Sequence, residues 1–344
     1  MTMALIVLQL VHAATSSPPP PPVSGVIYAL SQRNDSLLYY DKTGALHMIN
    51  SGAPVAPGFN PIGPQQTCID ADEAIMYMLA LNRTAPITML LGVSLSDALI
   101  HMSVVTPIVQ QGALIGAGET IDCVGNGVVI VTGQVADGKH AAFEIAPSIG
   151  SITPLASGFL SNETLQLLDY AHTLQLVRKN TKNDYIMWLV VAAATPPNTW
   201  DLVAIDLRSG ATTQRLHIGG TTRAVFPHTL SYDQHIDALI AVGLATGLSP
   251  LFFSIDAKPP HKYSVLATIP HGYSVMNGLS TYDSKGGVAY TLVDNDGNGN
   301  SNGGGGGGGG GQLIVGVCAA TKAVTEIPIC PGGGCGSPFN IDFF

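Results

Sequence analysis

The sequence predicts an all-β fold, a six-bladed β-propeller of four-stranded antiparallel blades in which the C-terminal strand closes the first blade. Three observations predict it. A short pattern ending in aspartate occurs six times, with successive aspartates 52, 47, 64, 50 and 59 residues apart. Apolar runs of strand length recur in the same order within each interval, separated by polar or glycine-containing loops. No interval holds a helical apolar period, so a repeat of about 50 residues indicates blades.

The aspartates that mark the repeat, here called the repeat aspartates, are Asp70, Asp122, Asp169, Asp233, Asp283 and Asp342. Each is expected to end the innermost strand of a blade and to accept backbone amide hydrogen bonds in the following turn. A catalytic role would require six active sites around one ring. We therefore interpret the repeat aspartates as structural.

The N-terminal part follows the same order of elements with one strand missing. Residues 26–30 match a second strand, residues 37–40 a third strand, and residues 41–44 the hairpin turn after it. The innermost strand of this unit is absent locally. Residues 338–344 carry the repeat pattern without a blade of their own, so we expect them to supply it.

The five following units each contain a second and a third strand. The second strands are predicted at 75–79, 128–131, 186–190, 238–242 and 288–292, and the third at 87–93, 141–145, 202–205, 251–255 and 313–317. The fourth unit allows two phases, because residues 173–177 could form its inner strand and move the repeat mark from Asp169 towards Asn180. Both phases give six blades.

Composition and charge narrow the function classes. Nearly half of the residues are hydrophobic, 11% are charged and the net charge is −9, which argues against nucleic acid or an anionic membrane as the main partner. Residues 1–13 resemble a signal peptide, with an uncleaved leader as the alternative, and residues 14–24 form a proline-rich spacer. Residues 25–344 are then a single propeller, and no run of about 20 apolar residues predicts a membrane span.

Two further features fit secretion. Asn34, Asn82 and Asn162 each begin an acceptor triplet for N-glycosylation beside a predicted loop. Among five cysteines, Cys330 and Cys335 are the favoured disulfide, because the three glycines between them allow a small ring to close. The pairing of Cys68, Cys123 and Cys318 stays open.

A glycine-rich, low-complexity loop is predicted at 294–311. Its first residues place oxygen ligands in the alternating order that begins a calcium loop: Asp294, Asp296, Asn298 and Asn300. The twelfth position is Gly305 instead of a bidentate glutamate, which excludes an EF-hand. We favour a flexible loop without a cofactor, and a Ca²⁺ site is the alternative.

The region from residue 26 to 344 resembles the six-bladed β-propeller superfamily, in particular the quinoprotein-like and YVTN-like propellers. The likeness rests on Ile-Asp strand ends followed by Ser-Gly hairpins, as at Ile69-Asp70 and Ser209-Gly210. It implies a fold and no particular activity, and no catalytic residue is carried over from it.

Two function classes follow. We favour a secreted, non-enzymatic binding or structural propeller whose loop face holds an extracellular protein or glycan in a coat, matrix or recognition complex. The alternative is a hydrolase or lactonase with a divalent metal in the central channel. The candidate acid and base residues for such an enzyme lie near the predicted mouth of the ring: Glu119, Glu163, His228 and His271.

Overall fold

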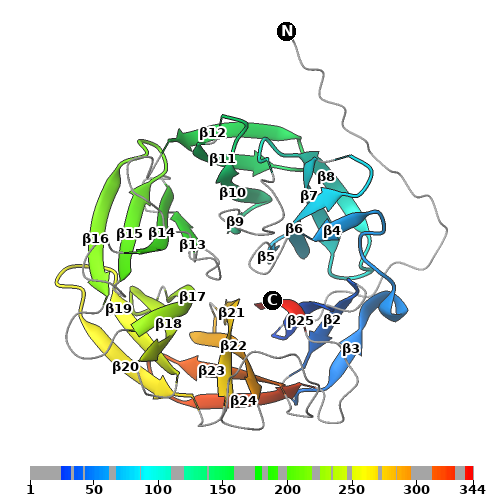
Figure 1. Cartoon of the computed structure of the whole chain (residues 1–344). Coiled ribbons are helices and arrows are strands. Elements are labelled where there is room, and N and C mark those ends of the chain that lie inside the picture. Colours follow the sequence, from blue (N-terminus) through cyan, green and yellow to red (C-terminus); the bar gives the residue numbers. More distant parts are fainter. Residues whose placement is uncertain are drawn as a thin grey trace, which may run out of the picture.

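A computed structural model describes residues 25–31, 35–41, 43–61, 67–85, 87–109, 120–137, 139–158, 175–179, 185–192, 200–218, 225–233, 235–245, 250–269, 273–283, 285–295, 312–329 and 338–343. In these residues the chain forms six antiparallel sheets. Figure 1 shows them arranged radially around one axis, with the inner strands near the centre and the outer strands on the rim. The chain is a six-bladed β-propeller, as predicted.

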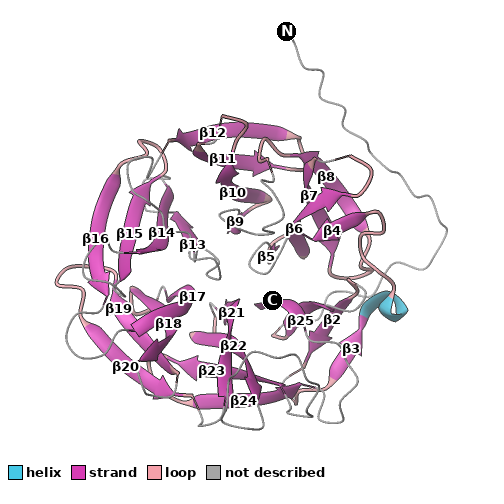
Figure 2. Cartoon of the chain, in the orientation of Figure 1, coloured by secondary structure: helices cyan, strands magenta, loops and turns pink. Residues whose placement is uncertain are grey.

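Blades 1 and 2 come first along the chain. Blade 1 contains, from axis to rim, β25 (Pro338–Phe343), β1 (Ile27–Ser31), β2 (Leu37–Tyr40) and β3 (Leu46–Met48). The short 3-10 helix η1 (Ile49–Gly52) follows β3 and is the one helix in the described residues (Figure 2). Blade 2 contains β4 (Phe59–Pro61), β5 (Thr67–Asp70), β6 (Ile75–Asn82), β7 (Thr88–Ser94) and β8 (Ile100–Val105).

The other four blades have four strands each, in the order of the sequence. Blade 3 contains β9 (Thr120–Gly125), β10 (Val128–Gln134), β11 (His140–Ala146) and β12 (Ser151–Ser157). Blade 4 contains β13 (Gln175–Lys179), β14 (Tyr185–Ala192), β15 (Trp200–Asp206) and β16 (Thr212–Ile218). Blade 5 contains β17 (Val225–Asp233), β18 (Ala238–Ala245), β19 (Leu251–Asp256) and β20 (Tyr263–Thr268). Blade 6 contains β21 (Tyr273–Asp283), β22 (Val288–Asn295), β23 (Gln312–Cys318) and β24 (Val324–Ile329).

One expectation about the inner strands needs correction, and one of the two phases left open for the fourth unit is supported. Blade 2 is not four-stranded, because two short strands, β4 and β5, both pair with β6. Pro61 ends β4, and proline cannot donate a ladder hydrogen bond. In blade 4 the inner strand is β13, which pairs with β14 and supports the later of the two phases. Asp169 lies outside the described residues.

β1 and β25 come from opposite ends of the chain and lie side by side in blade 1. They pair antiparallel, with Tyr28 opposite Asp342 and Ala29 opposite Ile341. No hairpin joins these two strands. In each of blades 2 to 6, by contrast, the inner strand is followed directly in sequence by its partner.

The hydrophobic core is divided into six layers, one in each seam between adjacent blades. Alternate residues of a second strand face opposite seams: Tyr77 of β6 packs towards blade 3, whereas Met76 and Met78 pack towards blade 1. Both faces of such a strand are buried. This explains why the second strands are continuous apolar runs in the sequence.

Candidate functional site

Three repeat aspartates cap the turn that follows their strand. Asp70 Oδ1 accepts hydrogen bonds from the amides of Asp72 (2.9 Å) and Glu73 (3.3 Å). Asp233 and Asp283 repeat the arrangement with the amides two and three residues later, at 2.8 and 3.4 Å and at 2.9 and 2.9 Å. These are the turn hydrogen bonds expected of an aspartate that ends a strand.

Asp70 also reaches the next blade. Its Oδ2 accepts a hydrogen bond of 2.7 Å from the amide of Gly127, in the β9–β10 hairpin of blade 3. Gly127 has φ +69°, and a Cβ there would lie 2.5 Å from Glu73 Oε1. The Glu73 carboxylate accepts a further hydrogen bond from the Tyr77 hydroxyl (2.9 Å). Glu73 and the glycine hairpin thus lie against each other across the seam between blades 2 and 3 at this end of the strands.

A disulfide joins the same two blades. Cys68 of β5 and Cys123 of β9 are bonded, with Cα atoms 5.5 Å apart and a sequence separation of 55. Side chains alternate between the two faces of a strand, so Cys68 shares the face of Asp70 whereas Cys123 lies opposite Asp122. Cys68 therefore faces blade 3, and Cys123 faces back towards blade 2.

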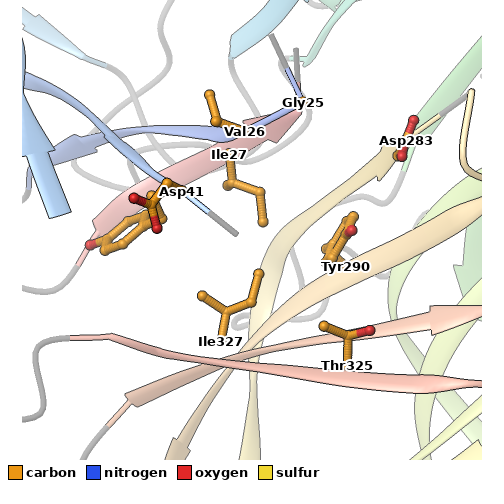
Figure 3. A pocket seen from close by; sticks show the side chains of 9 residues that line it. Gly25, Val26, Ile27, Asp41, Asp283, Tyr290, Thr325 and Ile327 are labelled. Atoms are coloured by element: carbon orange, nitrogen blue, oxygen red, sulfur yellow. The ribbon is translucent and has the colours of Figure 1, made fainter. Parts of the chain in front are cut away.

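The seam between blades 6 and 1 contains a cavity of about 300 Å³. It opens at the end of the strands where β21 ends and β1 begins, away from the connection between β1 and β2. Its lining residues come from both blades: Gly25, Val26, Ile27, Tyr40, Asp41, Asp283, Tyr290, Thr325 and Ile327. In Figure 3, Ile27 and Ile327 point towards each other, with Asp41 on one side and Tyr290 and Asp283 on the other. We call this space the seam cavity.

Blade 6 lacks the glutamate with which blade 2 contacts the next blade. Tyr290 follows Asp283 by seven residues, as Tyr77 follows Asp70, but the position of Glu73 is taken by Gly286. A Cβ at Gly286 would lie 2.3 Å from Asp283 Oδ2, so a side chain here would require the Asp283 carboxylate to move. The neighbouring blade also brings no hairpin to this seam. Both differences leave space.

The two carboxylates of the seam cavity differ in their surroundings. Asp41 Oδ1 accepts hydrogen bonds from Thr43 Oγ1 (2.6 Å) and the Thr43 amide (2.8 Å), and Oδ2 lies 3.0 Å from His47 Nε2. The Thr43 hydroxyl, His47 and the Thr43 amide hold the pKa of Asp41 well below its usual range. The two turn bonds of Asp283 both go to Oδ1. Oδ2 of Asp283 therefore keeps acceptor capacity towards the cavity.

Two tyrosines line the seam cavity. Burial, and then the nearby Asp283 carboxylate, raise the pKa of Tyr290. Tyr40 is 1% exposed, and in the described part of the chain its hydroxyl has no hydrogen-bond partner. Burial raises the pKa of Tyr40 to about 12.

The remaining predicted site residues are mostly outside the described residues. That group comprises Asn34, Asn162, Cys330, Cys335, Asp296, Asn298 and Asn300, together with Glu119, Glu163 and His271. Asp294 and His228 lie in β22 and β17, and Asp342 lies in β25. Asn82 ends β6, and its Oδ1 accepts hydrogen bonds from the amide (2.8 Å) and hydroxyl (2.7 Å) of the exposed Thr84. Of the four predicted calcium ligands, Asp294 alone lies within the described residues.

Sequence reasoning missed the seam cavity and the Cys68–Cys123 bond. A signal for the bond was present, because each cysteine stands within two residues of a repeat aspartate in successive blades. Among the described residues, no three His, Cys, Asp or Glu side chains gather as a metal site would require. No helix of the described residues is long and apolar enough to cross a membrane.

No family model matches the sequence, and no curated protein matches it. Solved structures do match the fold. TolB from Acinetobacter baumannii aligns with 11% identity and a TM-score of 0.53, over 94% of this chain and 67% of TolB. A protein from Bacteroides uniformis described as a candidate 6-phosphogluconolactonase aligns with 11% identity and a TM-score of 0.52, over 93% of this chain and 99% of its own. A DUF4784 family protein from Bacteroides caccae aligns with 8% identity and a TM-score of 0.52, over 94% of this chain and 74% of its own. These likenesses show the six-bladed propeller fold alone.

Proposed function

We propose that this propeller is a secreted, non-enzymatic binding or structural protein that presents one loop face to an extracellular protein or glycan. The observation that carries the proposal is the Cys68–Cys123 disulfide, which links the inner strands of adjacent blades. Disulfides persist in oxidising compartments and are rare in the cytosol of most organisms. A signal peptide at residues 1–13 would deliver the chain there.

Asn82 supports the choice of the loop face. It is the last residue of the second strand of blade 2, where the connection to the third strand begins with the exposed Arg83 and Thr84. An acceptor triplet in an exposed turn is open to glycosylation, and a glycan there is compatible with secretion. We extend the proposal to Asn34 and Asn162, which begin the other two triplets.

Ring closure belongs to the same proposal. The pairing of β25 with β1 gives the inner edge of β1 a partner. We propose that this pairing holds the propeller shut, so that the loops are presented on a rigid scaffold. Rigid presentation reduces the conformational entropy lost when a partner binds.

Secretion is tested by expressing the full chain in a secreting eukaryotic cell line. We expect the protein in the medium, with Cys68 and Cys123 oxidised and a mass that falls after enzymatic deglycosylation and in the Asn82→Gln variant. Retention inside the cell with both thiols reduced would contradict the proposal.

The binding face is tested with engineered glycans. Asp137→Asn with Lys139→Thr creates an acceptor triplet in the second-to-third strand turn of blade 3, on the proposed face. The control is Ile149→Asn, which creates one beside Ser151 in a turn at the opposite end of the strands, where Ile149 is 78% exposed. On arrays of glycans and matrix proteins, the first variant should lose a ligand that the control retains. Equal loss in both variants, or hydrolysis of a lactone panel that a chelator abolishes, would overturn the proposal.

A further inference from the structure

The seam cavity lies at the opposite end of the strands from the proposed loop face, so it needs an explanation of its own. We propose that it binds a primary ammonium group carried on a short alkyl stem. The inference does not depend on the proposed function. It rests on how the seam between blades 6 and 1 differs from the seam between blades 2 and 3.

In the seam between blades 2 and 3, the second oxygen of the repeat aspartate accepts a hydrogen bond from the next blade. Asp70 Oδ2 is 2.7 Å from the Gly127 amide. At the matching place beside Asp283, blade 1 offers the start of β1 instead of a hairpin, and Asp283 Oδ2 has no such donor among the described residues. The missing group is a hydrogen-bond donor. A carboxylate that is partly shielded from water prefers a charged donor.

The polar wall favours a cation over an anion. Asp283 and Asp41 both line the cavity, and the hydroxyl groups of Tyr290 and Thr325 add oxygen atoms. Asp41 is occupied by Thr43 and His47, so it contributes charge more than acceptor capacity. An anionic ligand would meet two carboxylates at close range, which is unfavourable. The net charge of −9 acts in the same direction at longer range.

The apolar wall explains the stem. Val26, Ile27 and Ile327 form the part of the cavity between the two acids, and Ile27 is 2% exposed (Figure 3). A volume of about 300 Å³ is at the lower end for small-molecule sites and corresponds to about ten water molecules. A chain of about four methylene groups that ends in an ammonium group combines an apolar body with a charged donor. Free alkylamines and the lysine side chain of a protein share this chemistry.

The two isoleucines allow a direct binding measurement. In protein labelled with ¹³C at the isoleucine δ1 methyl groups, the signals of Ile27 and Ile327 report on the cavity. n-Butylammonium chloride is titrated against n-butanol, its uncharged analogue. Nα-acetyl-lysine N-methylamide is compared in the same way with Nα-acetyl-norleucine N-methylamide, which lacks the ammonium group. We expect saturable shifts of both methyl signals with the ammonium compounds, with Kd of about 1 mM, and at least tenfold weaker binding of the uncharged ones.

Matched variants test whether the Asp283 carboxylate binds the ammonium group. Asp283→Asn keeps an oxygen for the turn amides and removes the carboxylate, so binding should weaken about tenfold. Asp233→Asn alters the equivalent turn of blade 5, which does not line the cavity, and should bind as the wild type does. Thr325→Lys at an exposed position supplies a tethered ammonium group and should block n-butylammonium while Asp283 stays in place.

The outcomes distinguish the two sources of the ammonium group and test the proposal itself. Binding of both ammonium compounds indicates a lysine side chain of a partner, and binding of n-butylammonium alone indicates a free amine. Three results would each overturn the proposal. The first is equal affinity for n-butylammonium and n-butanol, and the second is the absence of a saturable shift at Ile27 and Ile327. The third is n-butylammonium affinity that is unchanged in both Asp283→Asn and Thr325→Lys.

Discussion

Replacing Asp70 with alanine should destabilise two blades at once. The carboxylate is 1% exposed and accepts three backbone hydrogen bonds, two within its own turn and one from Gly127 of blade 3. A hydrogen bond to a buried charged group contributes about 2 kcal/mol, and each partly solvated turn bond contributes about 0.5–1 kcal/mol. The expected loss is about 3–4 kcal/mol. With an unfolding entropy of about 0.7 kcal/mol/K for 344 residues, this lowers the Tm by about 5 °C.

Two further variants divide this loss into its parts. Asp70→Asn keeps an oxygen for the turn amides but presents an NH₂ group or a weaker acceptor to Gly127, so it should cost about 2 kcal/mol. Asp206→Ala removes a carboxylate that caps only the exposed turn at Arg208 and Ser209, and should cost about 1 kcal/mol.

Calorimetry at neutral pH gives the ranking, and hydrogen exchange gives the location. In Asp70→Ala, exchange should accelerate in the turn after β5 and also in the β9–β10 hairpin of blade 3. If the hairpin exchanged as in the wild type, or if Asp70→Ala cost no more than Asp206→Ala, the bond between blades would have no energetic role and the reasoning would fail.

Three other perturbations test separate parts of the structure. Replacing Cys68 and Cys123 together by serine opens a crosslink across 55 residues and should cost about 4 kcal/mol; a wild-type denaturation midpoint that did not respond to reductant would contradict this. Deleting residues 336–344 removes the partner of β1 and should lower the thermal unfolding temperature steeply, whereas an unchanged melting curve by circular dichroism would refute ring closure through β25. The pKa of Tyr40, about 12 in the folded state, lies above its unfolded value of 10, because burial disfavours the phenolate; stability is therefore independent of this titration below pH 10 and falls as the pH rises towards 12. Tyr40→Phe should therefore flatten the fall in stability between pH 10 and 12. Because the hydroxyl has no hydrogen-bond partner in the described residues, the variant should also be about 1 kcal/mol more stable at neutral pH. A lower Tm of the variant by calorimetry would show that the hydroxyl is satisfied.

Much of the fold was predictable because each second strand is buried on both faces. Its apolar run is continuous, so residues 75–79 and 238–242 stand out between polar loops. Inner strands were harder to place, because they pair along one edge and carry fewer apolar residues. Blade 4 illustrates this, since its inner strand is Gln175–Lys179 and includes two basic residues.

The seam cavity could not be predicted from the repeat. It depends on what blade 6 lacks relative to blade 2, a glutamate at the position of Gly286 and a hairpin on the facing blade. A repeat pattern shows which positions are shared, but an empty volume arises from packing between segments that are far apart in sequence. The disulfide has the same origin, since Cys68 and Cys123 are brought together by the stacking of blades and not by their local sequence.

The pairing of β1 with β25 has a consequence for biosynthesis. β1 is made among the first residues of the described chain, but the strand that covers its inner edge is made about 300 residues later. At about 5–20 residues per second, this edge waits at least about 15 seconds for its partner during translation. An unpaired edge is a template for pairing with other chains. Early folding of this protein therefore calls for protection of β1, by a chaperone or by delayed collapse, until synthesis has reached Pro338.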